Sequence, residues 1–194
     1  GSNQRHSDRF LWCFFQAAYS NQTTLGGCMG TVLVIAASDG KNLVLAKKWV
    51  EVGTEFGYTM DILELCADEL PLYTPRRDDE GSPVLLQVIE QRMAAADAWV
   101  ICAPEYNGSI PPTLNNTIAW LSTKGEDFRG LFNGRPVGLS THSGGGGQGV
   151  IAAMRMQFSY LGSNVVGRSV ISNKTKEANP DAMRFILEQL SKLS

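Results

Sequence analysis

The 194-residue chain carries little net charge and few of the residues that build metal centres. Its formal net charge is −2, and there is no run of like charges. This argues against nucleic acid or an anionic membrane surface as the main partner. The two histidines are His6 and His142, and the four cysteines lack metal-ligand spacing. We therefore expect no resident metal, and reduced thiols in a cytoplasmic protein.

Several motifs of common enzyme classes are also missing. No apolar stretch reaches the length of a membrane span. There is no Gly-x-Ser-x-Gly elbow, and His142 and Ser143 are adjacent, a spacing at which two side chains rarely face each other across a site. No Gly-Lys-Ser/Thr follows the glycine-rich stretch, so a Walker phosphate loop is excluded. Hydrolysis by a Ser/His triad and P-loop nucleotide hydrolysis are therefore not expected.

Residues 1–28 form an N-terminal extension that we expect to lie outside the core of a single domain, residues 29–194. Met29 stands immediately before the first strand-like run, where a start would be expected. The apolar residues 10–15 faintly suggest a signal peptide, but polar residues 20–24 interrupt the region where the apolar stretch should continue. We assign no function to this extension.

Runs of buried-type residues alternate with amphipathic segments along the rest of the chain. Continuous apolar runs and alternating patterns predict five strands, and apolar residues at helical spacing predict five helices. The composition of residues 76–83 predicts a polar loop. In the helix that follows, we expect Leu85, Val88 and Ile89 to face inward. The predicted strands are 31–37, 58–66, 98–102, 136–140 and 164–171, and the predicted helices are 45–56, 84–96, 112–124, 151–161 and 183–190. This alternation predicts an α/β fold with a doubly wound sheet.

Loops that follow the first, third and fourth strands should meet at one edge of such a sheet, where ligands bind. The first, Ser38 to Asn42, opens a helix whose N-terminal amides suit a phosphate, although an ordinary Asp-Gly turn has the same composition. The second, residues 103–112, offers Pro104 and Tyr106 as a rigid apolar surface. The third, residues 140–149, is rich in glycine and can approach a flat ring closely, although its last residues also fit a flexible loop.

The second loop resembles a known family. Its residues Pro104-Glu105-Tyr106-Asn107-Gly108-Ser109-Ile110-Pro111, followed by Leu114, Asn115 and Trp120-Leu121-Ser122, resemble the NADPH-dependent FMN reductases. These are flavodoxin-like quinone, azo-dye, chromate and flavin reductases. The resemblance covers roughly residues 29–171 and implies a flavodoxin-like three-layer sandwich with a five-stranded parallel sheet in the order 2-1-3-4-5. It also implies non-covalent FMN, NADPH or NADH as co-substrate, and a homodimer or homotetramer.

The resemblance implies where FMN would be held, and one loop departs from the family pattern. The usual first loop is Gly-Ser-x-Arg-x-x-Ser-x-Asn, whereas this chain keeps Ser38 and Asn42 but loses three residues, including the arginine. Lys41 is then the substitute cation, and Asp39 brings a negative charge close to the phosphate. The expected FMN contacts are Ser38, Asp39, Gly40, Lys41, Asn42, Pro104, Glu105, Tyr106, Asn107, Gly108, Ser140, His142, Ser143, Gly144 and Gly145.

From these residues we expect an FMN-dependent NAD(P)H oxidoreductase. Hydride would pass from NAD(P)H to N5 of FMN and then to a small acceptor (a quinone, an azo compound, a metal oxyanion or free flavin) by a ping-pong mechanism. The flavin carries the hydride chemistry, so no protein residue is assigned a catalytic role, and Glu105 has a positioning role at most. The alternatives are a flavodoxin-type electron carrier and a scaffold that has lost FMN. A carrier typically has a more acidic face for docking redox partners than a net charge of −2 provides.

Overall fold

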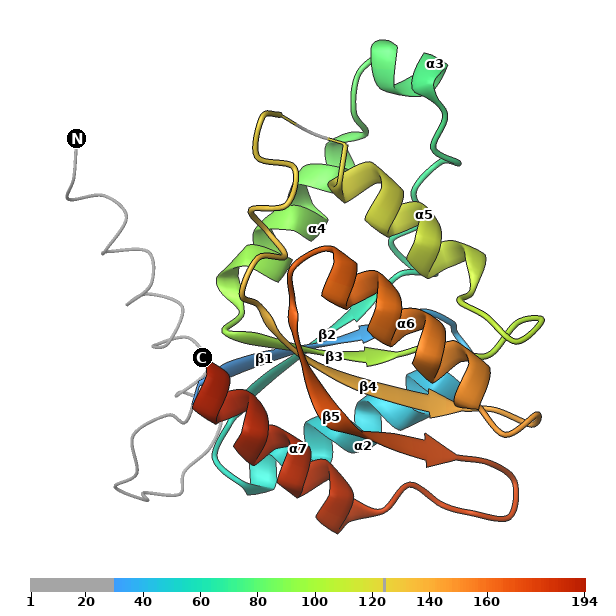
Figure 1. The fold of residues 1–194 in the computed structure, drawn as a ribbon, viewed down its shortest axis with the longest axis vertical. Helices are drawn as coiled ribbons and strands as arrows, with labels where there is room; N and C mark the ends of the chain where they lie inside the picture. Colours follow the sequence, from blue (N-terminus) through green and yellow to red (C-terminus); the bar gives the residue numbers. More distant parts are fainter. Residues whose placement is uncertain (1–29, 124) are drawn as a thin grey trace, which may run out of the picture.

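The computed structural model describes residues 30–123 and 125–194. The expectations for the extension 1–28, and for His6, Cys13 and Cys28, therefore concern residues outside the described part. Within that part, no helix is both long and apolar enough to cross a membrane. The described residues form one parallel sheet between two layers of helices (Figure 1).

Five parallel strands form the sheet, in the order β2-β1-β3-β4-β5. This confirms the strand order that the family resemblance implied. The central strands are continuous apolar runs because both of their faces are covered by helices. The strands are β1 (Thr31–Ala36), β2 (Thr59–Glu64), β3 (Ala98–Cys102), β4 (Pro136–His142) and β5 (Asn164–Ser172).

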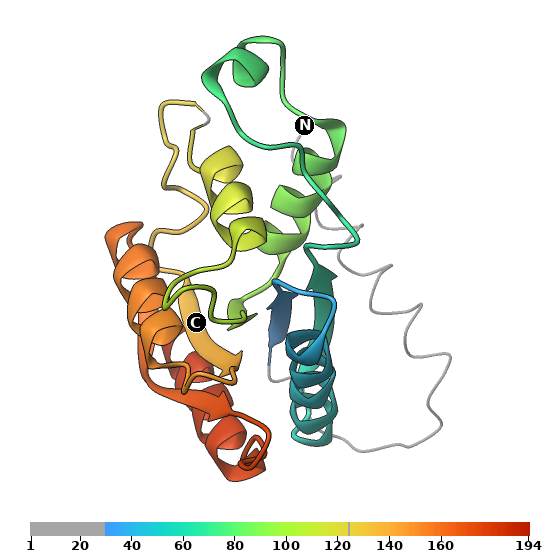
Figure 2. The same cartoon turned by 90° about the vertical axis from the view of Figure 1, so that its right-hand side faces the viewer.

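The longer helices divide between the two faces of the sheet, as Figures 1 and 2 show. Helices α2 (Lys41–Glu55) and α7 (Pro180–Leu193) bury their apolar stripes on one face. Helices α4 (Val84–Ala95), α5 (Pro112–Leu121) and α6 (Gln148–Tyr160) cover the other face. Each apolar stripe has the 3.6-residue period that the sequence displays, so the sequence predicted these five helices correctly.

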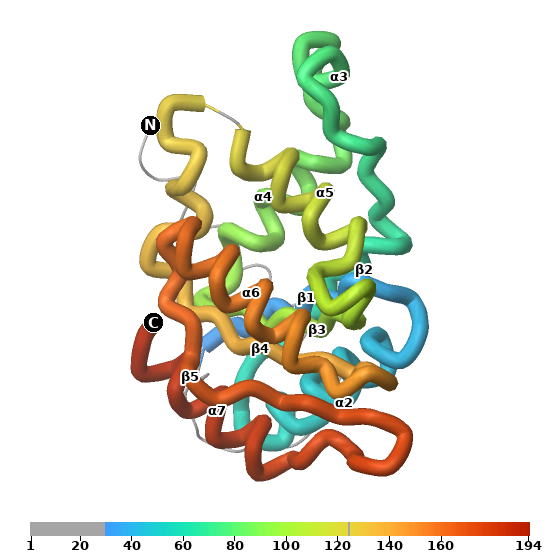
Figure 3. The backbone as a smooth tube through the Cα atoms, turned by 45° about the vertical axis from the view of Figure 1, so that its right-hand side comes forward, coloured from blue at the N-terminus to red at the C-terminus, as the bar shows by residue number. Residues whose placement is uncertain are grey.

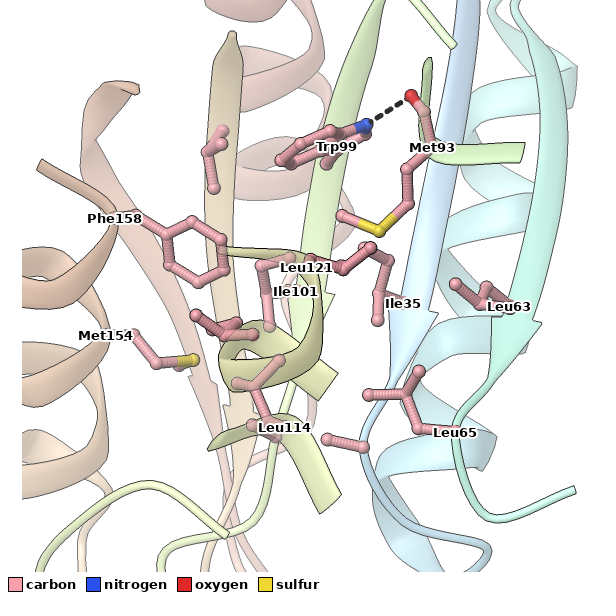
Figure 4. Close-up of a cluster of buried hydrophobic side chains, with 14 of the residues drawn as sticks. Ile35, Leu63, Leu65, Met93, Trp99, Ile101, Leu114, Leu121, Met154 and Phe158 are labelled. Atoms are coloured by element: carbon pink, nitrogen blue, oxygen red, sulfur yellow. Dashed lines mark hydrogen bonds between the residues drawn. The ribbon is translucent and has the colours of Figure 1, made fainter. Parts of the chain in front are cut away.

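The core on the α4–α6 side is organised around strand β3 (Figure 4). Trp99 is fully buried there, and its indole Nε1 donates to the carbonyl oxygen of Met93 at 2.9 Å. The same cluster includes Ile35 of β1, Ile101 of β3 and Phe158 of α6. A buried indole whose N–H is satisfied fills this volume without an unpaired donor.

Two local expectations differ from the structure. Residues 76–83 are not entirely loop, because Pro75–Asp79 form the short helix α3, whose N-cap Thr74 accepts from the Arg77 amide at 3.2 Å. This helix projects from the end of the molecule away from the sheet (Figure 3). In α4 the buried residues are Leu86, Ile89 and Met93, while Val88 is exposed. The adjacent apolar residues of this helix fit two overlapping stripes, and only packing selects one.

Candidate functional site

The loop between β1 and α2 leaves the amino end of a long helix open. Gly40 is the N-cap of α2, no side chain caps the helix, and its first turn has no acidic residue. Within the described residues, the backbone N–H groups of Ser38, Gly40, Lys41 and Asn42 have no hydrogen-bond acceptor. Lys41 and Gly40 are exposed beside them. Unpaired amides at the positive end of a helix dipole form a binding site for an anion.

The Asn42 side chain is used differently from the sequence expectation, which placed it against the ligand. It is only 2% exposed, and its Nδ2 donates to the His142 carbonyl oxygen at 3.1 Å. Its Oδ1 accepts from the His142 N–H at 2.9 Å. The carboxamide therefore braces the first turn of α2 against the end of β4, and only the backbone N–H of Asn42 is left for a ligand.

The loop between β3 and α5 is a tight hairpin turn. The N–H of Tyr106 donates to the Ser109 carbonyl oxygen at 3.1 Å, and the N–H of Ser109 donates back to Tyr106 at 3.0 Å. Asn107 and Gly108 between them have φ values of 52° and 72°. Two positive φ values in a two-residue loop define a type I′ turn, and Asn-Gly is its preferred sequence. The turn presents the N–H groups of Asn107 and Gly108 at its tip.

Other residues of this loop divide between the core and the surface. Pro104 is buried, while Tyr106 is 50% exposed beside the turn. Glu105 is half-buried, and its Oε2 accepts from the Val150 N–H in the first turn of α6 at 3.1 Å. The N–H of Tyr106 is occupied within the turn and is therefore not open to a ligand.

The loop between β4 and α6 combines buried polar residues with an exposed glycine segment. Ser140 is completely buried, and its hydroxyl accepts from Trp49 Nε1 at 3.0 Å. His142 Nδ1 lies 3.1 Å from Ser172 Oγ, and Ser143 Oγ accepts from the Gly145 amide at 3.2 Å. Gly144, Gly145 and Gly146 are exposed. Ser140 therefore belongs to the core, whereas the segment from Ser143 to Gly146 borders the sheet edge.

Two threonines that the sequence did not single out tie the three loops together. Thr113 Oγ1 in α5 donates to the Ala37 carbonyl oxygen at 2.6 Å, and Thr141 Oγ1 donates to the Ala103 carbonyl oxygen at 2.6 Å. A strand end and a helix start supply these residues, and no local sequence pattern distinguishes them from ordinary threonines. The loops are therefore held at the edge of the sheet to which all five parallel strands point (Figure 1).

Two thiols lie close to these loops. Burial raises the pKa of Cys66, which follows β2, and the Asp39 carboxylate raises it further, against a hydrogen bond from the Asp39 backbone. Burial also raises the pKa of Cys102 well above its ordinary value. Both thiols are therefore protonated at neutral pH, so neither is an activated nucleophile. No group of metal-ligating side chains occurs among the described residues.

The edge thus offers two regions of different chemistry. Open amides and Lys41 at the start of α2 suit a dianion, although the Asp39 charge opposes it. The hairpin turn, Tyr106 and the glycine segment suit a flat ring with polar edges. A Cβ at Gly40, Gly108, Gly144 or Gly146 would meet no atom within 4 Å, so the backbone is open to close approach there. This donor set fits a ligand with a phosphate at one end and an aromatic ring at the other.

Comparisons with known proteins find a matching family and related sequences. The family model of NADPH-dependent FMN reductases matches residues 31–177. The quinone reductase of Escherichia coli K12 is 33% identical over 107 residues, 55% of this chain and 53% of that protein. The NADPH azoreductase of Bacillus sp. OY1-2 is 31% identical over 116 residues, 57% of this chain and 60% of that protein. The match thus spans little more than half the length of these curated relatives.

Solved structures share the fold at lower sequence identity. The flavoenzyme NAD(P)H:(acceptor) oxidoreductase from Paracoccus denitrificans superposes with a TM-score of 0.64 at 18% identity. The superposition covers 84% of this chain and 94% of that one. At this identity the likeness establishes the arrangement of strands and helices.

Proposed function

Because the chain belongs to the NADPH-dependent FMN reductase family, we propose that it binds FMN non-covalently and oxidises NADPH or NADH. One observation carries the proposal. The unpaired amides of α2 lie at the same sheet edge as the hairpin turn and the exposed glycines. When bound, FMN supplies the redox chemistry by accepting hydride from NAD(P)H and passing reducing equivalents to a small acceptor. The names of the relatives, quinone reductase and azoreductase, favour quinones and azo compounds over metal oxyanions.

The chain's own residues would bind and orient the cofactor. The phosphate would be held by Lys41 and by the amides at the start of α2, while the turn and the glycine segment would border the ring. N–H groups at a ring edge stabilise negative charge that develops there, which is how a protein tunes a bound flavin. The proposed contacts are Ser38, Asp39, Gly40, Lys41, Asn42 through its backbone, Pro104, Tyr106, Asn107, Gly108, His142, Ser143, Gly144 and Gly145.

We also propose that the protein works as a homodimer or homotetramer. Large apolar side chains are exposed at the start of α4 and in the segment before α3, where Val84 is 84% and Leu72 68% exposed. Sedimentation velocity measures the oligomeric state directly, and a monomer at micromolar concentration would contradict this proposal.

Lys41→Ala is expected to weaken FMN binding by about ten- to a hundredfold while barely changing riboflavin binding. A charge-assisted hydrogen bond contributes roughly 1.5 to 3 kcal/mol, and riboflavin lacks the phosphate that would receive it. Fluorescence titration of the apoprotein with both flavins at low and moderate salt measures the effect. Lys47→Ala, which removes an exposed lysine further along α2, is the matched control. If Lys41→Ala binds FMN as tightly as the parent, the backbone amides alone hold the phosphate.

Turnover with a quinone is expected to follow ping-pong kinetics. Donor and acceptor would occupy one stacking surface beside Tyr106, so the oxidised nicotinamide must leave before the quinone binds. Initial rates measured over a grid of both concentrations should give parallel double-reciprocal lines. Intersecting lines would indicate a ternary complex and count against a shared surface. Absence of any NAD(P)H oxidation by FMN-loaded protein would favour the electron-carrier alternative instead.

A further inference from the structure

Helix α6 begins without a cap of its own. Its N-cap is Gly147, which has no side chain, and its first turn contains no acidic residue. Such a start leaves backbone N–H groups without acceptors unless another part of the structure supplies them. In α6 the third helical residue is Val150, and the N–H of this position is one that an N-cap side chain ordinarily satisfies.

Glu105 supplies the missing acceptor from a different loop. Its Oε2 accepts from the Val150 N–H at 3.1 Å across 45 residues of sequence. A carboxylate at this place also interacts favourably with the positive end of the helix dipole. Within the described part of the chain, this is the one side-chain hydrogen bond that joins residues 105–109 to another element. The hairpin turn is therefore anchored on α6 through the residue that immediately precedes it.

The same two loops also touch at their backbones. A Cβ at Gly149 would collide with the carbonyl oxygen of Gly108 and lie 3.1 Å from Glu105 Oε2. A Cβ at Gly145 would lie 3.2 Å from Glu105 Oε1. The turn thus rests on the first turn of α6, and the Glu105 carboxylate lies between the turn and the glycine segment.

We infer that Glu105 is a positioning residue that caps α6 and thereby holds the hairpin turn at a fixed distance from the glycine segment. This inference rests on the proposed function, because the two loops are the proposed borders of the flavin ring. Glu105 acts through the turn and transfers no proton. Preorganising both borders before the ring arrives reduces the ordering that binding would otherwise require. Its effect should therefore fall on the ring end of the cofactor and leave the phosphate end unchanged.

Glu105→Ala tests the inference with two readouts. In the apoprotein, hydrogen exchange of the hydrogen-bonded amides of Val150, Tyr106 and Ser109 should accelerate by about ten- to a hundredfold. FMN and riboflavin should both bind about tenfold more weakly, by the same factor, because both carry the ring. Glu105→Gln keeps an oxygen that accepts from Val150 and should restore most of the affinity. Glu90→Ala, on α4 and outside the three loops, controls for loss of a glutamate.

Gly149→Ala disturbs the same contact from the side of α6. Its new methyl group should displace the turn and weaken both flavins equally, with Glu105 intact. Gly167→Ala, where a Cβ would meet no atom within 4 Å, is the matched glycine control.

Unchanged exchange in Glu105→Ala would overturn the inference, and so would a glutamine variant as weak as the alanine one. A loss confined to FMN would also overturn it, because that pattern belongs to the phosphate. Failure of the parent protein to bind either flavin would overturn the proposed function instead, and the exchange rates of the apoprotein would still decide whether Glu105 anchors the turn.

Discussion

Asn42→Ala is expected to lower the free energy of unfolding by about 2 to 4 kcal/mol and to weaken FMN binding. The side chain is 2% exposed and satisfies both the N–H and the carbonyl oxygen of His142. Removing it leaves two backbone groups without partners, at roughly 1 to 2 kcal/mol each because both are only partly buried. It also releases the first turn of α2 from β4, so the amides proposed to hold the phosphate lose their fixed position.

Urea denaturation of the apoprotein measures this effect without the cofactor. Asn164→Ala is the control, because Asn164 is exposed and its Nδ2 makes one hydrogen bond, to the Gly134 carbonyl oxygen at 3.1 Å. A loss below about 1 kcal/mol is expected for that exposed position. Equal small losses for both variants would show that water replaces the bonds of Asn42, and that the brace between α2 and β4 contributes little.

Gly147→Ala is expected to destabilise the protein by about 2 to 5 kcal/mol and to reduce flavin affinity. Gly147 has a φ of 75°, in the left-handed region that an L-residue enters at roughly 1 to 3 kcal/mol. A Cβ there would also lie 2.6 Å from Thr141 Cγ2 and 3.3 Å from Ile171 Cγ2, both of which are held in adjacent strands. Relief of this clash must move the start of α6, and with it the glycine segment.

The neighbouring Gly146 separates the two contributions. Its φ is 101°, but a Cβ at this position would meet no atom within 4 Å. Gly146→Ala should therefore show the conformational cost alone, about 1 to 3 kcal/mol. Thermal and urea denaturation of both variants, followed by riboflavin titration, would compare them. If Gly146→Ala destabilises the protein as much as Gly147→Ala, steric contact with Thr141 is not the reason for glycine at position 147.

Asn42→Ala and Gly147→Ala both disturb contacts that hold the loops of the candidate site in place, and most of these contacts are buried. Asn42 and Thr141 stabilise the backbone of neighbouring loops, and Trp49 binds Ser140 within the core. The groups left open to a ligand are chiefly backbone amides, a lysine and a tyrosine. A cofactor that carries its own chemistry requires this kind of site, in which position and electrostatics matter more than a reactive side chain.

Much of the architecture could be predicted from local sequence. The runs 31–37 and 98–102 are apolar throughout because both faces of a central parallel strand are buried, and this pattern does not depend on distant residues. The apolar stripes of α2 and α7 could also be predicted, because their 3.6-residue period depends only on residues within each helix. The Asn107-Gly108 pair is also a local signal, since two positive φ values favour these residues, although we predicted no hairpin turn there. The strand order came from family resemblance, because alternation of strands and helices is compatible with several orders.

The roles of the polar residues at the sheet edge were decided by the tertiary structure. Ser38, Lys41, Asn42, Ser140 and Glu105 lie in the three loops that the family resemblance placed against the cofactor. Asn42 instead binds His142, 100 residues away, and Ser140 binds Trp49, 91 residues away. Whether a polar side chain faces a ligand or a neighbouring loop depends on which groups the fold brings near it. The sequence by itself determined the elements, the loops and the family, because those follow from local periodicity and motif, whereas the partner of each buried polar group exists only once distant strands and helices have packed.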